Sequence, residues 1–191
     1  MANFIGKAMW AKVNTKVDVY EGKELGYVIN VYPSNKKDLE KLKEEAFKIY
    51  EEAKTSPDYF VNGKPVKWSD NPLMPFKEDS EEKEFVVFKT KHTVQNKETK
   101  IEEKRIVPVM DKYGKRIDNT EIGNDSTVNV AYTMKAYRNN ANICGVKLYL
   151  NAIQVKELVS FGGSDASSFG FEVEEKKNEF GFNEEDGDLP L

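Results

Sequence analysis

Alternation of apolar and polar side chains dominates the second half of the chain and limits it to a fold built mainly of strands. Segment 127–137 places Val128, Val130 and Tyr132 on one face of an extended backbone. Segment 145–159 repeats this alternation and supplies further core candidates. Shorter runs with strand character are bounded by glycine, proline and polar residues. They span 7–13, 27–32, 84–94 and 100–110.

One segment has the period of a helix instead. Residues 36–54 carry apolar side chains at helical spacing, and Asn35 before them offers an N-cap. Thr55-Ser56-Pro57 is expected to end this helix. The apolar face consists of Leu39, Leu42, Ala46, Ile49, Tyr50 and Ala53.

The order of these elements predicts a mainly β fold. Runs 84–94 and 100–110 flank the polar turn Gln95-Asn96-Lys97-Glu98, so we expect them to form a long hairpin, followed by a loop over 111–125. Five or more strands with one helix favour a small barrel or sandwich. The arrangement most compatible with a helix inserted among such strands is the five-stranded Greek-key barrel of the OB-fold.

The C-terminal segment of the chain differs in charge from the rest. Segment 172–191 holds eight acidic residues and two lysines, a net charge of −6, whereas the whole chain carries −4. Residues 1–171 are therefore mildly basic. We expect a domain over 1–161, a flexible Gly/Ser joint over 162–171 and a disordered acidic tail over 172–191. Such a tail can serve solubility, or it can cover the basic surface of its own domain and recruit a partner.

Composition argues against several classes of protein. Cys144 is the one cysteine, so the chain has no internal disulfide and we expect a cytoplasmic location. No stretch approaches the ~20 apolar residues of a membrane span. His92 and Cys144 are too few for a zinc site of His and Cys ligands, and no P-loop or nucleophile motif occurs. We therefore predict no metal, no cofactor and no enzymatic activity; a metal-dependent nuclease is a remote alternative.

Aromatic and cationic residues are interleaved on the predicted strands. Sequence-tolerant binding of single-stranded nucleic acid needs aromatic faces for stacking and cations along the backbone path. Alternation leaves open which of Phe85 and Phe88 is exposed, and we take Phe88 as the candidate; Trp10 and Trp68 are interpreted as packing residues. The predicted DNA-binding residues are Tyr32, Phe88, Lys89, Lys91, Lys104, Arg105, Lys135, Tyr137, Arg138, Lys147 and Tyr149.

The C-terminal half also resembles a known family. The segment Val107-Pro108-Val109-Met110-Asp111-Lys112-Tyr113-Gly114-Lys115-Arg116-Ile117 resembles a turn of bacteriophage single-stranded DNA-binding proteins. Val128-Asn129-Val130-Ala131-Tyr132, segment 145–159, Gly162-Gly163 and Phe169-Gly170-Phe171 follow in the order of that family, before an acidic tail. The resemblance covers residues 105–191.

This resemblance implies an OB-fold protein that coats single-stranded DNA in phage replication, recombination and repair, in the host cell cytoplasm. It also suggests a homodimer, and a tail that contacts replication proteins such as a DNA polymerase or a helicase/primase while competing with DNA. The tail residues expected to bind a partner are Glu184, Glu185, Asp186, Asp188, Leu189, Pro190 and Leu191. The rival hypothesis is a non-enzymatic protein–protein adaptor or DNA-mimic inhibitor.

Overall fold

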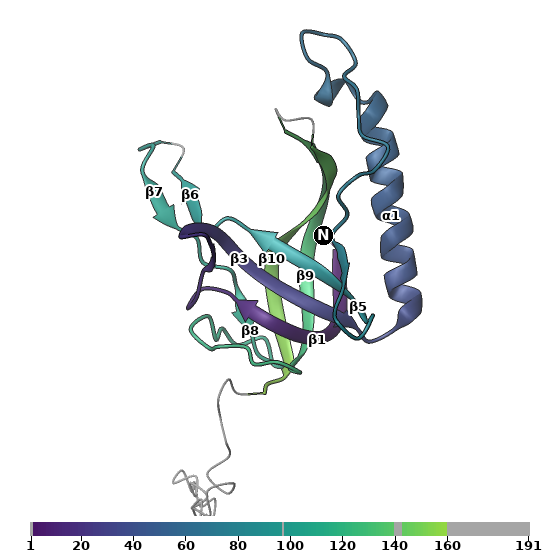
Figure 1. The fold of residues 1–191 in the computed structure, drawn as a ribbon. Helices are drawn as coiled ribbons and strands as arrows, with labels where there is room; N and C mark the ends of the chain where they lie inside the picture. Colours follow the sequence, from purple (N-terminus) through teal and green to yellow (C-terminus); the bar gives the residue numbers. More distant parts are fainter. Residues whose placement is uncertain (1, 97, 140–142, 160–191) are drawn as a thin grey trace, which may run out of the picture. The chain divides into compact units, whose positions relative to one another are not determined.

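Five strands close into a ring in the computed structural model, which describes residues 2–96, 98–139 and 143–159 (Figure 1). β1 (Ala2–Lys12) pairs with β3 (Lys23–Pro33), and β3 pairs with β5 (Glu84–Thr90), both antiparallel. β5 runs parallel to β10 (Cys144–Glu157), β10 pairs with β9 (Thr127–Arg138), and β9 returns to β1. This closed ring confirms the predicted five-stranded OB-type barrel.

Short elements decorate the ring. β2 (Asp18–Tyr20) forms a hairpin with β3, β4 (Phe76–Glu78) pairs with β5, and β8 (Val109–Met110) runs parallel to β10. β6 (Thr93–Gln95) and β7 (Glu102–Lys104) make a separate two-stranded sheet. A 3-10 turn, η1 (Pro57–Tyr59), follows the helix.

The predicted long hairpin of 84–94 with 100–110 is wrong. Both edges of β5 are already occupied, one by β3 and the other by β4 and then β10, so β5 has no edge left for residues 100–110. Between these two runs, the one hairpin that forms is the short pair β6–β7, beyond the end of β5. No helix or strand lies within residues 111–125, in agreement with the predicted loop.

The barrel core comes from the two-residue period of its strands. Side chains that point inward are almost fully buried, whereas their neighbours along each strand point outward. The inward-facing set includes Ile29, Val31, Val86, Phe88, Val128, Val130, Leu148 and Leu150.

Helix α1 (Lys36–Thr55) lies on one side of the barrel, in agreement with the predicted 36–54 (Figure 1). The Asn35 side chain accepts a hydrogen bond from the Lys37 backbone N–H at 2.9 Å, which caps the first turn. Leu39 and Leu42 join the barrel core, and Tyr50 belongs to a second cluster with Trp68. Within the described part of the chain, no helix has the length and apolar character needed to cross a membrane.

Candidate nucleic-acid interface

The outer face of three neighbouring strands presents cations and tyrosines together. Leu148 and Leu150 of β10 point into the core, so Lys147 and Tyr149 point outward. Tyr149 lies opposite Lys89 of β5, and Lys147 lies opposite Lys135 of β9. Strand register therefore brings residues from distant parts of the sequence onto one surface.

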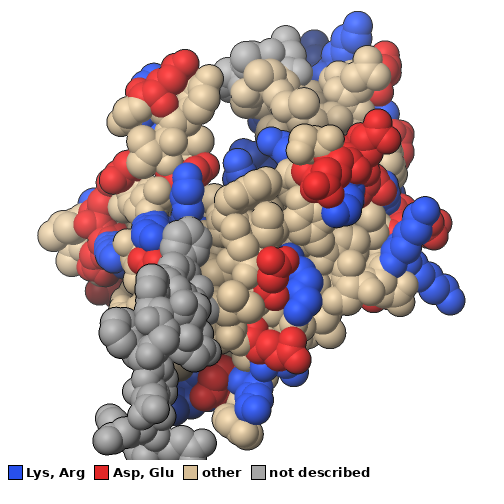
Figure 2. Space-filling model, turned by 60° about the horizontal axis from the view of Figure 1, so that its bottom comes forward, with Lys and Arg blue, Asp and Glu red and all other residues tan. Residues whose placement is uncertain are grey.

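Two hollows of about 570 Å³ and about 430 Å³ follow this surface and share Thr90, Lys91 and Tyr149. We treat them together as the basic groove. Its charged and aromatic lining is Lys77, Lys89, Lys91, Arg105, Lys135, Tyr137, Lys147 and Tyr149. Of the residues that the structure describes, no carboxylate lines either hollow. Figure 2 shows blue side chains set back in the hollow between the β6–β7 and β9–β10 hairpins.

The two groove tyrosines differ in their surroundings. Lys147 Nζ lies 4.3 Å from the centre of the Tyr137 ring, which is a cation–π contact. Burial raises the pKa of the Tyr137 hydroxyl above its usual value of 10.0, so this ring stays neutral at physiological pH. Tyr149 is 37% exposed. Both rings offer an aromatic surface on which a base can stack.

An irregular segment forms one wall of the groove. Leu73 donates its backbone N–H to the Cys144 carbonyl at 2.9 Å and accepts from the Val146 N–H at 3.0 Å, so the segment is attached to β10. Leu73, Met74 and Pro75 supply apolar surface there, and Lys77 follows on β4. Leu73, Met74 and Pro75 are not among the predicted residues, because segment 71–75 carries no periodic signal in the sequence.

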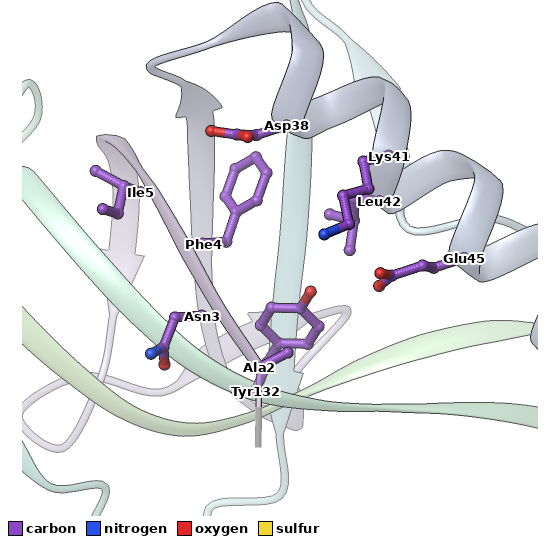
Figure 3. Close-up of a pocket in the computed structure, with 9 residues that line it drawn as sticks. All are labelled: Ala2, Asn3, Phe4, Ile5, Asp38, Lys41, Leu42, Glu45 and Tyr132. Carbon is purple, nitrogen blue, oxygen red and sulfur yellow. The ribbon is translucent and has the colours of Figure 1, made fainter.

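A hollow of about 350 Å³ between α1 and β1 has the opposite chemistry (Figure 3). Asp38 and Glu45 outnumber Lys41 in its lining. Burial and the Glu45 carboxylate raise the pKa of Tyr132 to about 12, and its hydroxyl lies on the side of the helix residues in Figure 3. Two carboxylates repel a polyanion, so this hollow is a poor candidate for nucleic acid.

The groove brings together seven of the eleven residues predicted from the sequence. These are Lys89, Lys91, Arg105, Lys135, Tyr137, Lys147 and Tyr149. Lys104 is exposed on β7 but does not line the groove. Arg138 follows the groove residue Tyr137, and its Nε donates to the Lys67 carbonyl at 3.3 Å instead.

The prediction of Phe88 as a stacking residue is wrong. Its side chain is fully buried in the barrel, with the Phe4 and Tyr132 rings 5.8 and 5.4 Å away between centroids. Phe85 points to the outside, yet it is only 6% exposed because Tyr32 and Trp10 pack against it. Neither phenylalanine has a free face for a base.

Tyr32 lies in a different environment from the groove. Its hydroxyl donates to Asp79 Oδ2 at 2.5 Å, and Asp79 and Glu81 line the hollow beside it. Burial and this hydrogen bond raise the pKa of Tyr32 to about 12. The structure thus separates Tyr32 from the cationic surface. Trp68 is buried as predicted, and Trp10, although 49% exposed, packs edge-on against Phe85 with 6.3 Å between the ring centroids.

Comparisons with known proteins agree with this geometry. The family model described as the single-stranded DNA-binding protein of bacteriophage T7 matches residues 26–158. The single-stranded DNA-binding protein of Enterobacteria phage T3 is 29% identical over 160 residues, which are 78% of this chain and 69% of the T3 protein. That of Escherichia phage T7 is 29% identical over 153 residues, which are 75% of this chain and 66% of the T7 protein.

Solved structures of other single-stranded DNA-binding proteins share this fold. The crystal structure of gp2.5, a single-stranded DNA-binding protein encoded by bacteriophage T7, has 27% identity and a TM-score of 0.63, over 92% of this chain and 97% of that one. The single-stranded DNA-binding protein of bacteriophage Enc34, solved with single-stranded DNA, supports the fold alone, at 11% identity and a TM-score of 0.53 over 84% and 87%.

The barrel with its basic, tyrosine-bearing groove defines the class of nucleic-acid-binding proteins. Within that class, the chain belongs to the family of the bacteriophage T7 single-stranded DNA-binding protein.

Proposed function

We propose that the basic groove binds single-stranded DNA without sequence preference. The observation that carries this proposal is the lining of the groove, which combines six cations and two tyrosines with no carboxylate among its described residues. Cations along a groove neutralise phosphates, and each stacked base contributes about 1–3 kcal/mol. Every base has a π-face, so stacking tolerates any sequence.

The shape of the surface favours a single strand over a duplex. Tyr137 and Tyr149 lie in hollows, where only a base outside a helical stack can reach a ring. Helix α1 carries six lysines and six carboxylates, so it offers no net positive charge for docking in a major groove. The Asn151 side-chain amide donates a hydrogen bond to Thr133 Oγ1 at 2.7 Å, so these two polar groups of the groove lining already bond to each other.

Family membership supports a role in phage DNA replication, recombination and repair in the host cytoplasm. The homodimer and the tail contacts with a polymerase or a helicase/primase belong to the same proposal. The tail residues in question lie outside the described residues. They are Glu184, Glu185, Asp186, Asp188, Leu189, Pro190 and Leu191. Their sequence supports the proposal through charge, since segment 172–191 carries −6 and could compete with DNA for the groove.

The test is a titration of fluorescent oligo(dT) and of duplex DNA at several salt concentrations. We expect tighter binding of the single strand and a linear fall of log K with log salt. Equal affinity for both forms, or binding that ignores salt, would contradict the proposal. Failure to bind oligo(dT) would favour a protein–protein adaptor.

Deletion of residues 172–191 tests the competition by the tail. Removing a charge of −6 should tighten oligo(dT) binding, and the gain should shrink as salt screens the interaction. Unchanged or weaker binding by the truncated protein would rule out competition while leaving the groove proposal intact.

A further inference from the structure

A tight turn after β8 holds the most exposed aromatic ring among the described residues. Asp111 Oδ1 accepts the backbone N–H groups of Tyr113 and Lys115, both at 2.9 Å, and the Asp111 N–H donates to the Lys115 carbonyl. Gly114 takes the positive φ of +84° that this turn requires. The Tyr113 side chain is 83% exposed. We call residues 111–115 the Tyr113 turn.

The Tyr113 turn is attached to the strand that carries the basic groove. β8 pairs in parallel with β10, and the Ile153 N–H donates to the Pro108 carbonyl at 2.9 Å (Figure 1). Gln154 Nε2 donates to the Lys112 carbonyl at 3.4 Å. The turn therefore rests against the C-terminal half of β10.

A register shift places the turn and the groove on the same face. The pairing of β10 with β9 shifts by one residue between Leu150 and Ala152. Odd-numbered residues of β10 therefore point outward before Asn151, and even-numbered residues point outward after it. Tyr149 points outward before it and Gln154 points outward after it, while Ile153 and Val155 are buried. The outer face of β10 is thus continuous from Lys147 to the residue that contacts the turn.

The charges along this face suit a polyanion. Lys112 Nζ lies 5.0 Å from the Tyr113 ring centre, and the exposed Lys115 follows in the turn. The Asp111 carboxylate accepts backbone N–H groups, and Asp118 pairs with Arg116 at 2.5 Å. The outward side chains between the groove and the turn are uncharged. They are Asn129, Ala131, Ala152 and Gln154.

We propose that the Tyr113 turn is a second stacking site, at which Tyr113 binds a base of the same DNA strand that occupies the basic groove. The pairing of a tyrosine with a neighbouring lysine repeats the Lys147–Tyr137 arrangement at the other end of β10. Gly145, opposite Tyr137, and Gln154 are nine residues apart, at most roughly 30 Å of strand. This span is compatible with site sizes of about 4–16 nucleotides for an OB barrel.

This inference rests on the proposed function, and oligonucleotide length separates the two. In the full-length protein, Tyr113→Ala should weaken binding of an oligo(dT) of about 16 nucleotides by about 5- to 150-fold. An oligo(dT) of about 4 nucleotides should bind as before, because it fits within the groove. Tyr113→Phe keeps the ring and should match the wild type, as should Tyr20→Ala, which removes another exposed tyrosine on β2.

The outcomes distinguish the two proposals. If the wild type binds neither oligonucleotide, the proposed function fails. If the wild type binds and Tyr113→Ala leaves the long oligonucleotide unaffected, the second stacking site is wrong and the ring is free for a protein partner. An equal loss of affinity for the long and the short oligonucleotide in Tyr113→Ala would also contradict the second stacking site. Photo-crosslinking with 5-iodouracil oligonucleotides gives a direct check, since a long oligonucleotide should crosslink to Tyr113 and a short one should not.

Discussion

Lys147 Nζ lies 4.3 Å from the centre of the Tyr137 ring, across the ladder of β9 and β10. The residue directly opposite Tyr137 is Gly145, which has no side chain to cover the ring. Lys147 is the diagonal neighbour of Tyr137 and reaches it from the adjacent outward position. The ladder thus places a cation for phosphate beside a ring for a base.

Removal of the Tyr137 ring should weaken oligo(dT) binding by about 5- to 150-fold, the equivalent of one stacked base. Fluorescence anisotropy with Tyr137→Ala measures this loss, and Tyr137→Phe should retain most of the affinity because stacking needs no hydroxyl. Tyr20→Ala is the control for loss of a surface tyrosine. An unchanged affinity of Tyr137→Ala would place the DNA elsewhere.

Removal of the Lys147 charge should change the salt dependence as well as the affinity. Each phosphate contact to a single strand contributes about 0.7 to the slope of log K against log salt, so Lys147→Ala should lower that slope by about 0.7. Lys48→Ala, on the solvent side of α1, is the matched control and should keep the wild-type slope. A uniform loss with the slope unchanged would indicate that Lys147 supports the Tyr137 ring without contacting phosphate.

Local signals in the sequence predicted the helix almost to the residue. The apolar positions of residues 36–54 and the Asn35 cap depend only on neighbouring residues, and the structure ends α1 at Thr55. Strand ends were less predictable, because they depend on pairing. β1 begins several residues before the predicted 7–13, because its first residues pair with β9. β3 likewise begins before the predicted 27–32, because its first residues pair with β2.

The site could be predicted only where one strand face is clearly polar. Lys147 and Tyr149 alternate with buried aliphatic residues, so their outward orientation was readable from the sequence. Residues 85–88 are all buried, because β5 is covered on both faces, and alternation could not decide between Phe85 and Phe88. Lys77 reaches the groove through the β4–β5 pairing, which local sequence does not encode.

Phe88 should affect stability and not DNA contact. Phe88→Ala should lower the free energy of unfolding by about 3–5 kcal/mol, because it leaves a cavity among Phe4, Tyr132 and their neighbours. Urea denaturation measures this change. Phe88→Leu should be milder and should bind oligo(dT) like the wild type once folded. Loss of affinity in a folded Phe88→Leu protein would contradict the core assignment.

Gly145 should be required for the wall of the groove. A Cβ atom there would lie 2.1 Å from the Leu73 carbonyl oxygen, so Gly145→Ala must displace segment 71–75 or β10. We expect a loss of about 1–3 kcal/mol in unfolding free energy, as for other overpacked sites, together with weaker DNA binding. Gly145 has no positive φ, so the loss reports the steric contact and not backbone strain. A Gly145→Ala protein with the stability and the oligo(dT) affinity of the wild type would contradict a steric requirement at Gly145.

The Tyr32–Asp79 hydrogen bond should make part of the stability depend on acid pH. The Tyr32 hydroxyl is the largest cause that lowers the pKa of Asp79 below its usual 3.8, and the backbone N–H of Lys83 adds to the effect. Because the folded-state pKa is lowered, the ionised carboxylate stabilises the fold at pH above the unfolded value. That contribution is lost as pH falls through the lower folded value.

Tyr32→Phe removes the donor, so the pKa of Asp79 should rise toward 3.8 in this variant while the Lys83 and Glu81 backbone contacts persist. An NMR titration of the Asp79 carboxyl measures the shift directly. The stability difference between wild type and variant should be largest near neutral pH and should shrink as pH falls below the usual carboxyl pKa of 3.8. If Asp79 titrates identically in both proteins, its carboxylate is held by the backbone contacts alone. DNA binding should be unaffected in either case, because Tyr32 lies outside the basic groove.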